Sequence, residues 1–259
     1  MKYSFRVFTY IYTVLFIWII NPVAGQESPG NLTDSAGIYS MAMKAYGSDQ
    51  VFINGINHEN YYLNALGHPF LNEDRFYPGL VVIHSKQYNN IQLKFNIFDQ
   101  NLVIRQDLNN GTPVEFEPPV KFVSEFEINK MHFRKLKDES GREKFFQVVY
   151  DGDIKFLNFW SKQRVVSFHN ARVSSFRFDE EVKKSYLLLH NTFYRFSSAG
   201  SFQKIFPKEL IPEIKSFCRK ESIRPGKGSD ESLKKLTAFC DDLLKRNEKS
   251  ISGKPQRTN

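Results

Sequence analysis

The sequence predicts a mainly β protein, an antiparallel meander that forms a curved sheet, a sandwich or a partial barrel and is followed by a C-terminal two-helix hairpin. Three observations lead to this fold class. The chain contains 25 Phe and 12 Tyr but only two Trp, and Phe and Tyr favour pleated, half-buried surfaces. Turn residues recur about every 8–12 residues between short apolar runs, which is typical of sandwiches and barrels. The apolar period then changes from strand-like to helical near Phe202.

The clearest strands come first in this pattern. Residues 80–84 form a predicted strand that begins with the apolar run LVVI. In residues 91–98 every second side chain from Ile91 to Ile97 is apolar, which gives the second strand one apolar face. Residues 102–105 return after a turn at 99–101. Because such short connections join antiparallel neighbours, the three strands predict a meander.

The same pattern continues to residue 196. Asp151-Gly152 is a strong hairpin signal between two of the later strands, and Asn54-Gly55 is another, after a short strand at 51–53. The further predicted strands are 113–116, 122–126, 131–136, 143–150, 154–160, 165–168, 173–178, 186–190 and 192–196.

Two helices follow the strands, at 207–223 and 229–245. Pro212 belongs in a first turn, so the first helix proper begins near Ile211. Ser229 or Asp230 caps the second helix. A long meander needs a cover for its open face, and we expect the helices to pack on the sheet through Leu210, Ile214, Phe217, Leu236 and Phe239.

The first 25 residues predict a signal peptide. Lys2 and Arg6 precede an uncharged run of 14 residues, which is shorter than the roughly 20 residues of a membrane span. Asn21-Pro22 then breaks the helix, and small residues precede the expected cleavage before Gln26. We therefore expect an exported chain that is periplasmic, associated with the outer membrane or secreted. No transmembrane span is expected in the mature chain.

These signals divide the chain into five parts. They are the signal peptide at 1–25, a flexible lead-in at 26–39, the antiparallel β domain at 40–200, the helical hairpin at 205–246 and a disordered tail at 247–259.

Positive charge is concentrated at the C-terminal end. Residues 201–259 contain 14 Lys and Arg against 8 Asp and Glu, whereas residues 26–200 contain 20 of each. One interpretation is peripheral contact with an anionic membrane, and the other is solvated helix faces with a basic tail. Nucleic acid is not expected as the partner of an exported chain.

Two cysteines, Cys218 and Cys240, lie on the two predicted helices. An antiparallel hairpin could bring them within bonding range, which makes them a candidate disulfide in an oxidising compartment. The alternative is two thiols that pack as small hydrophobes. Their spacing has no CxxC pattern, which argues against redox catalysis and a zinc site.

No catalytic, metal-binding or cofactor residue is predicted. The chain has no G-x-S-x-G elbow and no glycine-rich phosphate loop. The spacings of its histidines do not match a metal-binding pattern; these are His58, His68, His84, His132, His169 and His190. An enzyme, such as a hydrolase with a site assembled from separate strands, is kept as the alternative function.

Four aromatic side chains are candidates for a ligand or partner surface, namely Tyr61, Tyr62, Phe70 and Tyr88. Such side chains supply large contact area either to an aromatic-lined groove or to the core. Both interpretations are open at this point, with the core as the commoner role.

The segments VFING at 51–55, GHPFL at 67–71 and YPGLV at 77–81, together with residues 88–104, carry a resemblance. The chain resembles a group of exported, β-rich proteins of unknown function from Gram-negative bacteria whose outer membranes carry many surface complexes. The resemblance implies export and β structure and supplies no activity. We therefore expect a non-catalytic exported protein that binds an envelope protein or an apolar ligand.

Overall fold

The computed structural model describes residues 56–58, 62, 65–107, 113–169 and 173–252. In the part of the chain that the structure describes, 46% of the residues lie in strands and 24% in helices, so the predicted mainly β fold class is confirmed. The predicted signal peptide, the lead-in, the strand at 51–53 and Tyr61 lie outside the described residues. The last seven residues of the predicted tail, 253–259, also lie outside them.

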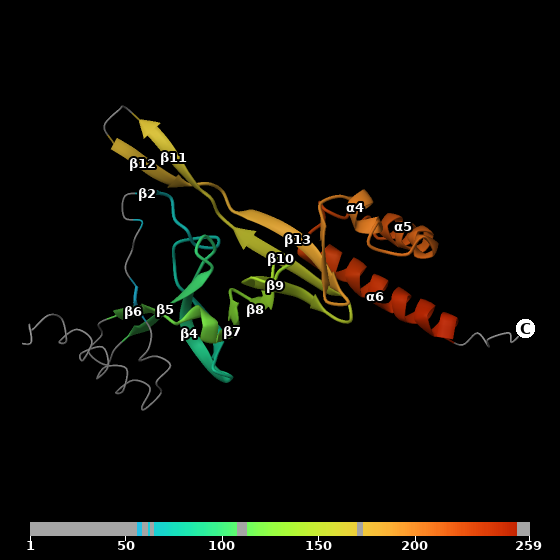
Figure 1. Cartoon of the computed structure of the whole chain (residues 1–259), viewed down its shortest axis with the longest axis horizontal. Coiled ribbons are helices and arrows are strands. Elements are labelled where there is room, and N and C mark those ends of the chain that lie inside the picture. Colours follow the sequence, from blue (N-terminus) through green and yellow to red (C-terminus); the bar gives the residue numbers. More distant parts are fainter. Residues whose placement is uncertain (1–55, 59–61, 63–64, 108–112, 170–172, 253–259) are drawn as a thin grey trace, which may run out of the picture. The chain divides into compact units, whose positions relative to one another are not determined.

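Eleven strands of the described residues form one antiparallel sheet, most of whose strands are labelled in Figure 1, with β1 and β14 outermost. In spatial order they are β1 (Ile56–Asn57), β6 (Pro113–Glu117), β5 (Asn101–Asp107), β4 (Lys86–Asn96), β3 (Tyr77–Ile83), β7 (Val123–Ile128), β8 (Met131–Lys137), β9 (Glu143–Asp151), β10 (Lys155–Ser161), β13 (Val182–Leu189) and β14 (Thr192–Phe196). Every strand predicted between residues 80 and 196 is present in the structure.

The sheet is not the simple meander that the sequence predicts. β3 pairs with β4 on one side and with β7 on the other, so the chain crosses over between β6 and β7. Pro118, Pro119 and the short 3-10 helix η1 (Val120–Phe122) occupy that connection. Because proline cannot continue a hydrogen-bonded ladder, β6 cannot simply turn back into a neighbour. Turn signals mark where a strand ends but do not say which strand it pairs with.

A second sheet contains three strands (Figure 1). β11 (Arg164–His169) and β12 (Val173–Phe178) form a hairpin that is inserted between β10 and β13. β2 (Ala65–Leu66) pairs with β12 in the parallel direction. The sequence predicts no parallel pair, because a two-residue strand is too short to show a period.

Several hairpins of the main sheet use two-residue turns in which both residues have positive φ. In the turn between β13 and β14, for example, φ is 47° at His190 and 61° at Asn191. This conformation is the one that a type I′ turn requires, and it matches the twist of the flanking strands.

The core of the first half of the sheet is aromatic. Phe95 is fully buried, and its ring centroid lies 5.0 Å from that of Phe126 and 5.1 Å from that of Phe133. Phe145 completes the group at 5.9 Å from Phe95. Aromatic pairs at these separations stabilise a core beyond their area burial, which accounts for the high Phe content of this chain.

Three α-helices cover one face of the second half of the sheet: α4 (Ala199–Gln203), α5 (Ile211–Lys220) and α6 (Asp230–Ser252). A short 3-10 helix, η2 (Lys208–Leu210), leads into α5, which begins at Ile211 with Pro212 in its first turn as predicted. α6 contacts β9 and β10, and α4 contacts β14 (Figure 1). The sequence did not predict α4. The second helix was expected to end at 245, but α6 continues to Ser252, so the first residues of the predicted disordered tail, 247–252, are helical.

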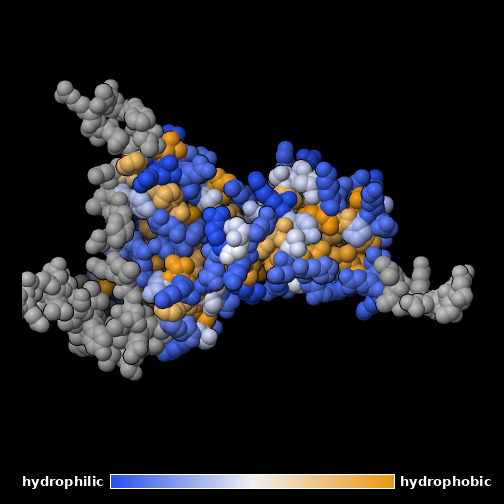
Figure 2. Space-filling model, in the orientation of Figure 1, coloured by the Kyte–Doolittle hydropathy of each residue, from blue (hydrophilic) through white to orange (hydrophobic). Residues whose placement is uncertain are grey.

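The predicted packing residues of the helices are confirmed. Leu210, Ile214 and Leu236 are buried in one cluster with side chains of the sheet such as Phe156. Phe217 of α5 and Phe239 of α6 stack face to face, with ring centroids 4.0 Å apart. The helical hairpin is therefore part of the hydrophobic core and not an appendage. Figure 2 shows hydrophobic residues among the hydrophilic ones at this end of the molecule.

Candidate functional site

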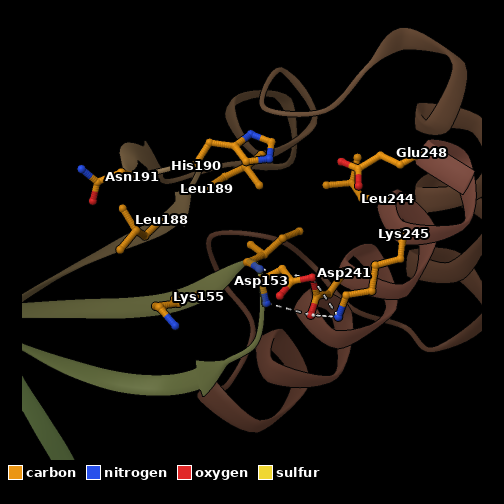
Figure 3. A pocket seen from close by; sticks show the side chains of 11 residues that line it. Asp153, Lys155, Leu188, Leu189, His190, Asn191, Asp241, Leu244, Lys245 and Glu248 are labelled. Carbon is orange, nitrogen blue, oxygen red and sulfur yellow. Dashed lines mark hydrogen bonds and ion pairs between the residues drawn. The ribbon is translucent and has the colours of Figure 1, made fainter. Parts of the chain in front are cut away.

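The helical unit, which we define as residues 197–252, borders two pockets. One lies between α6 and the turns β9–β10 and β13–β14 (Figure 3). The other lies beside α5 and is described second.

Asp241 dominates the first pocket. Its side chain is only 1% exposed, and its carboxylate accepts hydrogen bonds from Tyr150 Oη at 3.0 Å and from the backbone N–H groups of Asp153 and Ile154 at 3.3 and 3.2 Å. Lys245 Nζ lies 3.2 Å away on the next turn of α6 (Figure 3). These contacts join α6 to the turn between β9 and β10.

The turn itself is shaped for this contact. A Cβ on Gly152 would lie 2.2 Å from Asp241 Oδ2, so only glycine allows the carboxylate to approach. Burial, and then the hydrogen bond to Asp241, raise the pKa of the Tyr150 hydroxyl. Hydrogen bonds to Asp241 and Asp153 raise the pKa of Lys245. The carboxylate is thus saturated with internal donors, which suits a structural anchor and not a general acid or base.

The cavity beside this anchor has a volume of about 400 Å³ and is lined by both polar and apolar side chains. Ile154, Leu188, Leu189 and Leu244 supply its apolar lining, and His190 and Glu248 also line it (Figure 3). Its two lysines are both ion-paired, Lys155 with Asp151 and Lys245 with Asp153. Nothing in this arrangement favours a ligand of one charge.

A second polar anchor holds the start of α6. Asn158 is fully buried in β10, and its amide nitrogen donates to Asp230 Oδ2 at 3.1 Å. Lys183 Nζ of β13 donates to the other oxygen of Asp230 at 2.8 Å. Ser185 Oγ in turn donates to Asn158 Oδ1 at 2.9 Å, so the buried amide is satisfied at both ends.

The second pocket has a volume of about 530 Å³, and we call it the basic hollow. Three segments form it: residues 197–203 around α4, the second half of α5, and the loop 223–227. Its apolar lining comes from Ala199, Ile223 and Pro225, with the Cys218 thiol beside them. Ser197, Ser198 and Gln203 add neutral polar groups, and four basic residues also line the pocket, namely Lys215, Arg219, Arg224 and Lys227.

The loop 223–227 lies directly against the turn after β14. Gly226 has φ of 86°, and a Cβ at this position would lie 2.3 Å from the carbonyl oxygen of Ser197 and 2.6 Å from the backbone nitrogen of Ser198. Ser201 Oγ accepts hydrogen bonds from the N–H groups of both serines at 3.0 Å. Two walls of the basic hollow are therefore fixed by backbone packing and a helix cap.

The charge around the basic hollow is uncompensated. No acidic side chain lines it, and its four basic residues are exposed and form no ion pair within the described part of the chain. By contrast, nearby Lys235 is paired with Glu221. Four cations without counter-charges beside apolar side chains create a local positive potential that favours an anionic group.

The three described residues of the candidate aromatic surface make contacts inside the fold. Phe70 and Tyr88 are 5% and 7% exposed and belong to the core, so for them the core interpretation replaces the ligand surface. Tyr62 is half-buried, packs edge-on against Phe98 and Phe178 at 5.9 and 5.1 Å, and donates from Oη to Asp99 at 2.7 Å. Burying a large aromatic side chain is more favourable in free energy than leaving it exposed to solvent. Tyr61, the fourth candidate, lies outside the described residues.

Both cysteines are free thiols in the structure. Cys240 is buried in the core beneath the helices, and Cys218 is half-buried and lines the basic hollow. Burial raises the pKa of both thiols, and the neighbouring Cys218 adds to the effect on Cys240. Raised pKa values make both thiols poor nucleophiles. The Cys218–Cys240 disulfide stays a prediction.

Three of the described histidines make separate local contacts. His58 Nδ1 lies 2.6 Å from Glu117 Oε1, and the ring of His84 packs on Phe122. Burial lowers the pKa of His68, which lies beside Lys162. In the residues that the structure describes, no three metal-ligating side chains form a group.

No family model, no characterised protein and no solved structure matches the chain. The resemblance to exported bacterial proteins is therefore untested and stays a prediction. Among the described helices, none is long and apolar enough to cross a membrane.

Sequence reasoning missed the basic hollow as a site. Its signal was present, because Arg219, Arg224 and Lys227 flank Pro225-Gly226 within nine residues. A basic loop after a helix looks like any solvated connection, however, and the apolar lining comes partly from α4, which carries no helical pattern of its own.

Proposed function

We propose that this protein is an exported, non-catalytic binding protein of the periplasm or outer membrane, whose helical unit makes peripheral contact with anionic lipid. The observation that carries the proposal is the group of four unpaired cations around the basic hollow. Each basic residue near an anionic membrane surface contributes about 1 kcal/mol of attraction. Four together are enough for reversible binding without a membrane span.

Binding is favoured over catalysis because the polar clusters are internally satisfied. Asp241 and Asp230 accept hydrogen bonds that hold α6 in place, and Asp99 accepts a hydrogen bond from Tyr62. General acid–base chemistry needs groups that can reach a substrate and exchange protons with it. The four basic side chains of the basic hollow have no ion-pair partner among the described residues, so their role is to attract an anionic group.

Co-sedimentation with vesicles tests the binding part of the proposal. The chain without residues 1–25 is mixed with vesicles of phosphatidylcholine alone or with added phosphatidylglycerol. We expect binding only to the anionic vesicles and its loss at high salt, because salt screens exposed charges. Equal binding to neutral vesicles, or none to either, would overturn the proposed lipid contact. Capture of an envelope protein in the absence of lipid would assign the same cations to a protein partner.

Cell fractionation tests export. The full chain and a variant without residues 1–25 are expressed in a Gram-negative host, and the periplasmic, membrane and cytoplasmic fractions are compared. We expect the full chain outside the cytoplasm and the shortened chain inside it. A full chain that stays cytoplasmic would contradict the proposed location.

A further inference from the structure

We infer that the basic hollow is a binding site for a single anionic amphiphile, a hydrocarbon chain that ends in one acidic group. This inference rests on the proposed lipid contact and names the ligand class of the same site. It goes further because a flat cationic surface would attract headgroups without taking up a chain.

The first argument is the combination of size and lining. The basic hollow holds about 530 Å³, within the roughly 300–1,000 Å³ of small-ligand pockets. Ile223 and Pro225 are buried residues of its wall, and Ala199 and Cys218 add apolar atoms. A small inorganic anion would leave this apolar lining unused, whereas a hydrocarbon chain would cover it.

The second argument is the chemistry of the rim. Arg219 and Arg224 carry planar guanidinium groups that can each donate two parallel hydrogen bonds to a carboxylate or phosphate. Neither has an ion-pair partner within the described residues, so no ion pair has to be broken when a ligand binds. Lys215 and Lys227 add charge without such geometric preference.

The third argument is preorganisation. Gly226 holds the loop 223–227 against Ser197 at a separation that no side chain could tolerate. A ligand that enters therefore meets walls that are already in place, which lowers the entropic cost of binding. The site is built into the fold of the helical unit.

Fluorescence titration tests the inference. The probe is dansylaminoundecanoic acid, kept below its critical micelle concentration, and its methyl ester is the neutral counterpart. With the chain lacking residues 1–25, we expect saturable binding of one acid per chain. The ester should bind about tenfold more weakly or worse, because it loses the charge-assisted hydrogen bonds.

Paired charge reversals locate the site. The double variant Arg219→Glu and Arg224→Glu should weaken binding of the acid by about tenfold or more. The matched control is Lys208→Glu with Lys234→Glu, which changes the net charge equally at exposed residues that do not line the basic hollow. The control should bind like the unmodified chain, and both variants are checked for unchanged thermal unfolding.

Alkylation of Cys218 gives an independent readout. This half-buried thiol lines the basic hollow, whereas Cys240 is buried in the core. In the reduced protein, saturating probe should slow the reaction of Cys218 with iodoacetamide, as followed by mass spectrometry. An unchanged rate in the presence of bound probe would place the probe elsewhere and overturn the inference.

The remaining outcomes separate the two proposals. Equal affinity for acid and ester, or equal loss in the two double variants, overturns the inference. Binding to anionic vesicles without binding of the acid also overturns it and leaves the proposed function standing. Failure of both assays rejects both.

Discussion

Asp241 joins α6 to the β9–β10 turn through three donors of the sheet half of the molecule. Replacing Asp241 with Ala leaves the Tyr150 hydroxyl, the buried N–H group of Ile154 and the partly buried N–H group of Asp153 without their acceptor. Each such loss costs about 1–3 kcal/mol, so we expect the free energy of unfolding to fall by about 3 kcal/mol or more. Urea unfolding measures it. Asp242→Ala is the control, because the adjacent Asp242 is exposed and should change stability by less than about 0.5 kcal/mol. Similar losses in both variants would contradict the anchor role.

Asp138 makes stability depend on acid pH. Hydrogen bonds from Lys144 and then Ser140 hold the pKa of this carboxyl well below its ordinary value. Because the pKa is lower in the folded state, the ionised carboxyl stabilises the fold above the unfolded pKa of about 3.9. That contribution disappears as the pH falls through the lower folded value.

The Asp138→Asn variant tests this dependence. It should be less stable than the unmodified chain at about pH 7, and the difference should shrink toward about pH 3. Denaturant midpoints at both values measure it. Glu139→Gln, at the exposed neighbouring residue, is the control and should leave the pH dependence unchanged. A gap that stays constant with pH would exclude Asp138 as the titrating group.

At the scale of elements, the α5–α6 loop depends on one glycine. Gly226 has positive φ and lies against the backbone of Ser197. Gly141 also has positive φ, at 76°, but nothing lies within 4 Å of an added Cβ there. Gly141→Ala should therefore lose only the roughly 1–2 kcal/mol of backbone strain.

The Gly226→Ala variant adds a steric clash to that strain. We expect a larger loss of stability than in Gly141→Ala, together with weaker binding of the dansyl acid, because the loop must move away from the α4 turn. Thermal unfolding and the fluorescence titration measure the two effects. Equal losses of stability in the two alanine variants would mean that the loop is free to shift.

The elements themselves were largely predictable from sequence. Period-two patterns located the strands, and a period of 3.6 with Pro212 in a first turn located α5. The pairing of β3 with β7 was not predictable, because it joins segments that no short turn connects. The basic hollow was also not predictable, because it forms only when α4, α5 and the loop 223–227 meet. Phe70 and Tyr88 show the same limit, since sequence cannot say whether an aromatic side chain faces the core.

At the scale of the whole molecule, the helical unit completes the core of the second half of the sheet. Ile154, Phe156 and Leu187 are fully buried in the cluster that the helices supply from the other side. On the opposite face of the same strands, Leu157 and Leu188 belong to a separate, smaller cluster. The two faces of these strands therefore pack in different hydrophobic clusters, as expected when successive side chains of a strand point to opposite faces of the sheet.

Deleting residues 205–259 removes that cover. Exposed Ile154, Phe156 and Leu187, next to an open edge at β14, should give an insoluble or protease-sensitive product. Truncation after Ser252 is the control, because it keeps all of α6 and should unfold like the full chain. Limited proteolysis and thermal unfolding compare the two. If the larger deletion gives a soluble product that folds cooperatively, the sheet is stable without its helices. The contacts of Asp230 and Asp241 would then serve only to position the helical unit with its basic hollow.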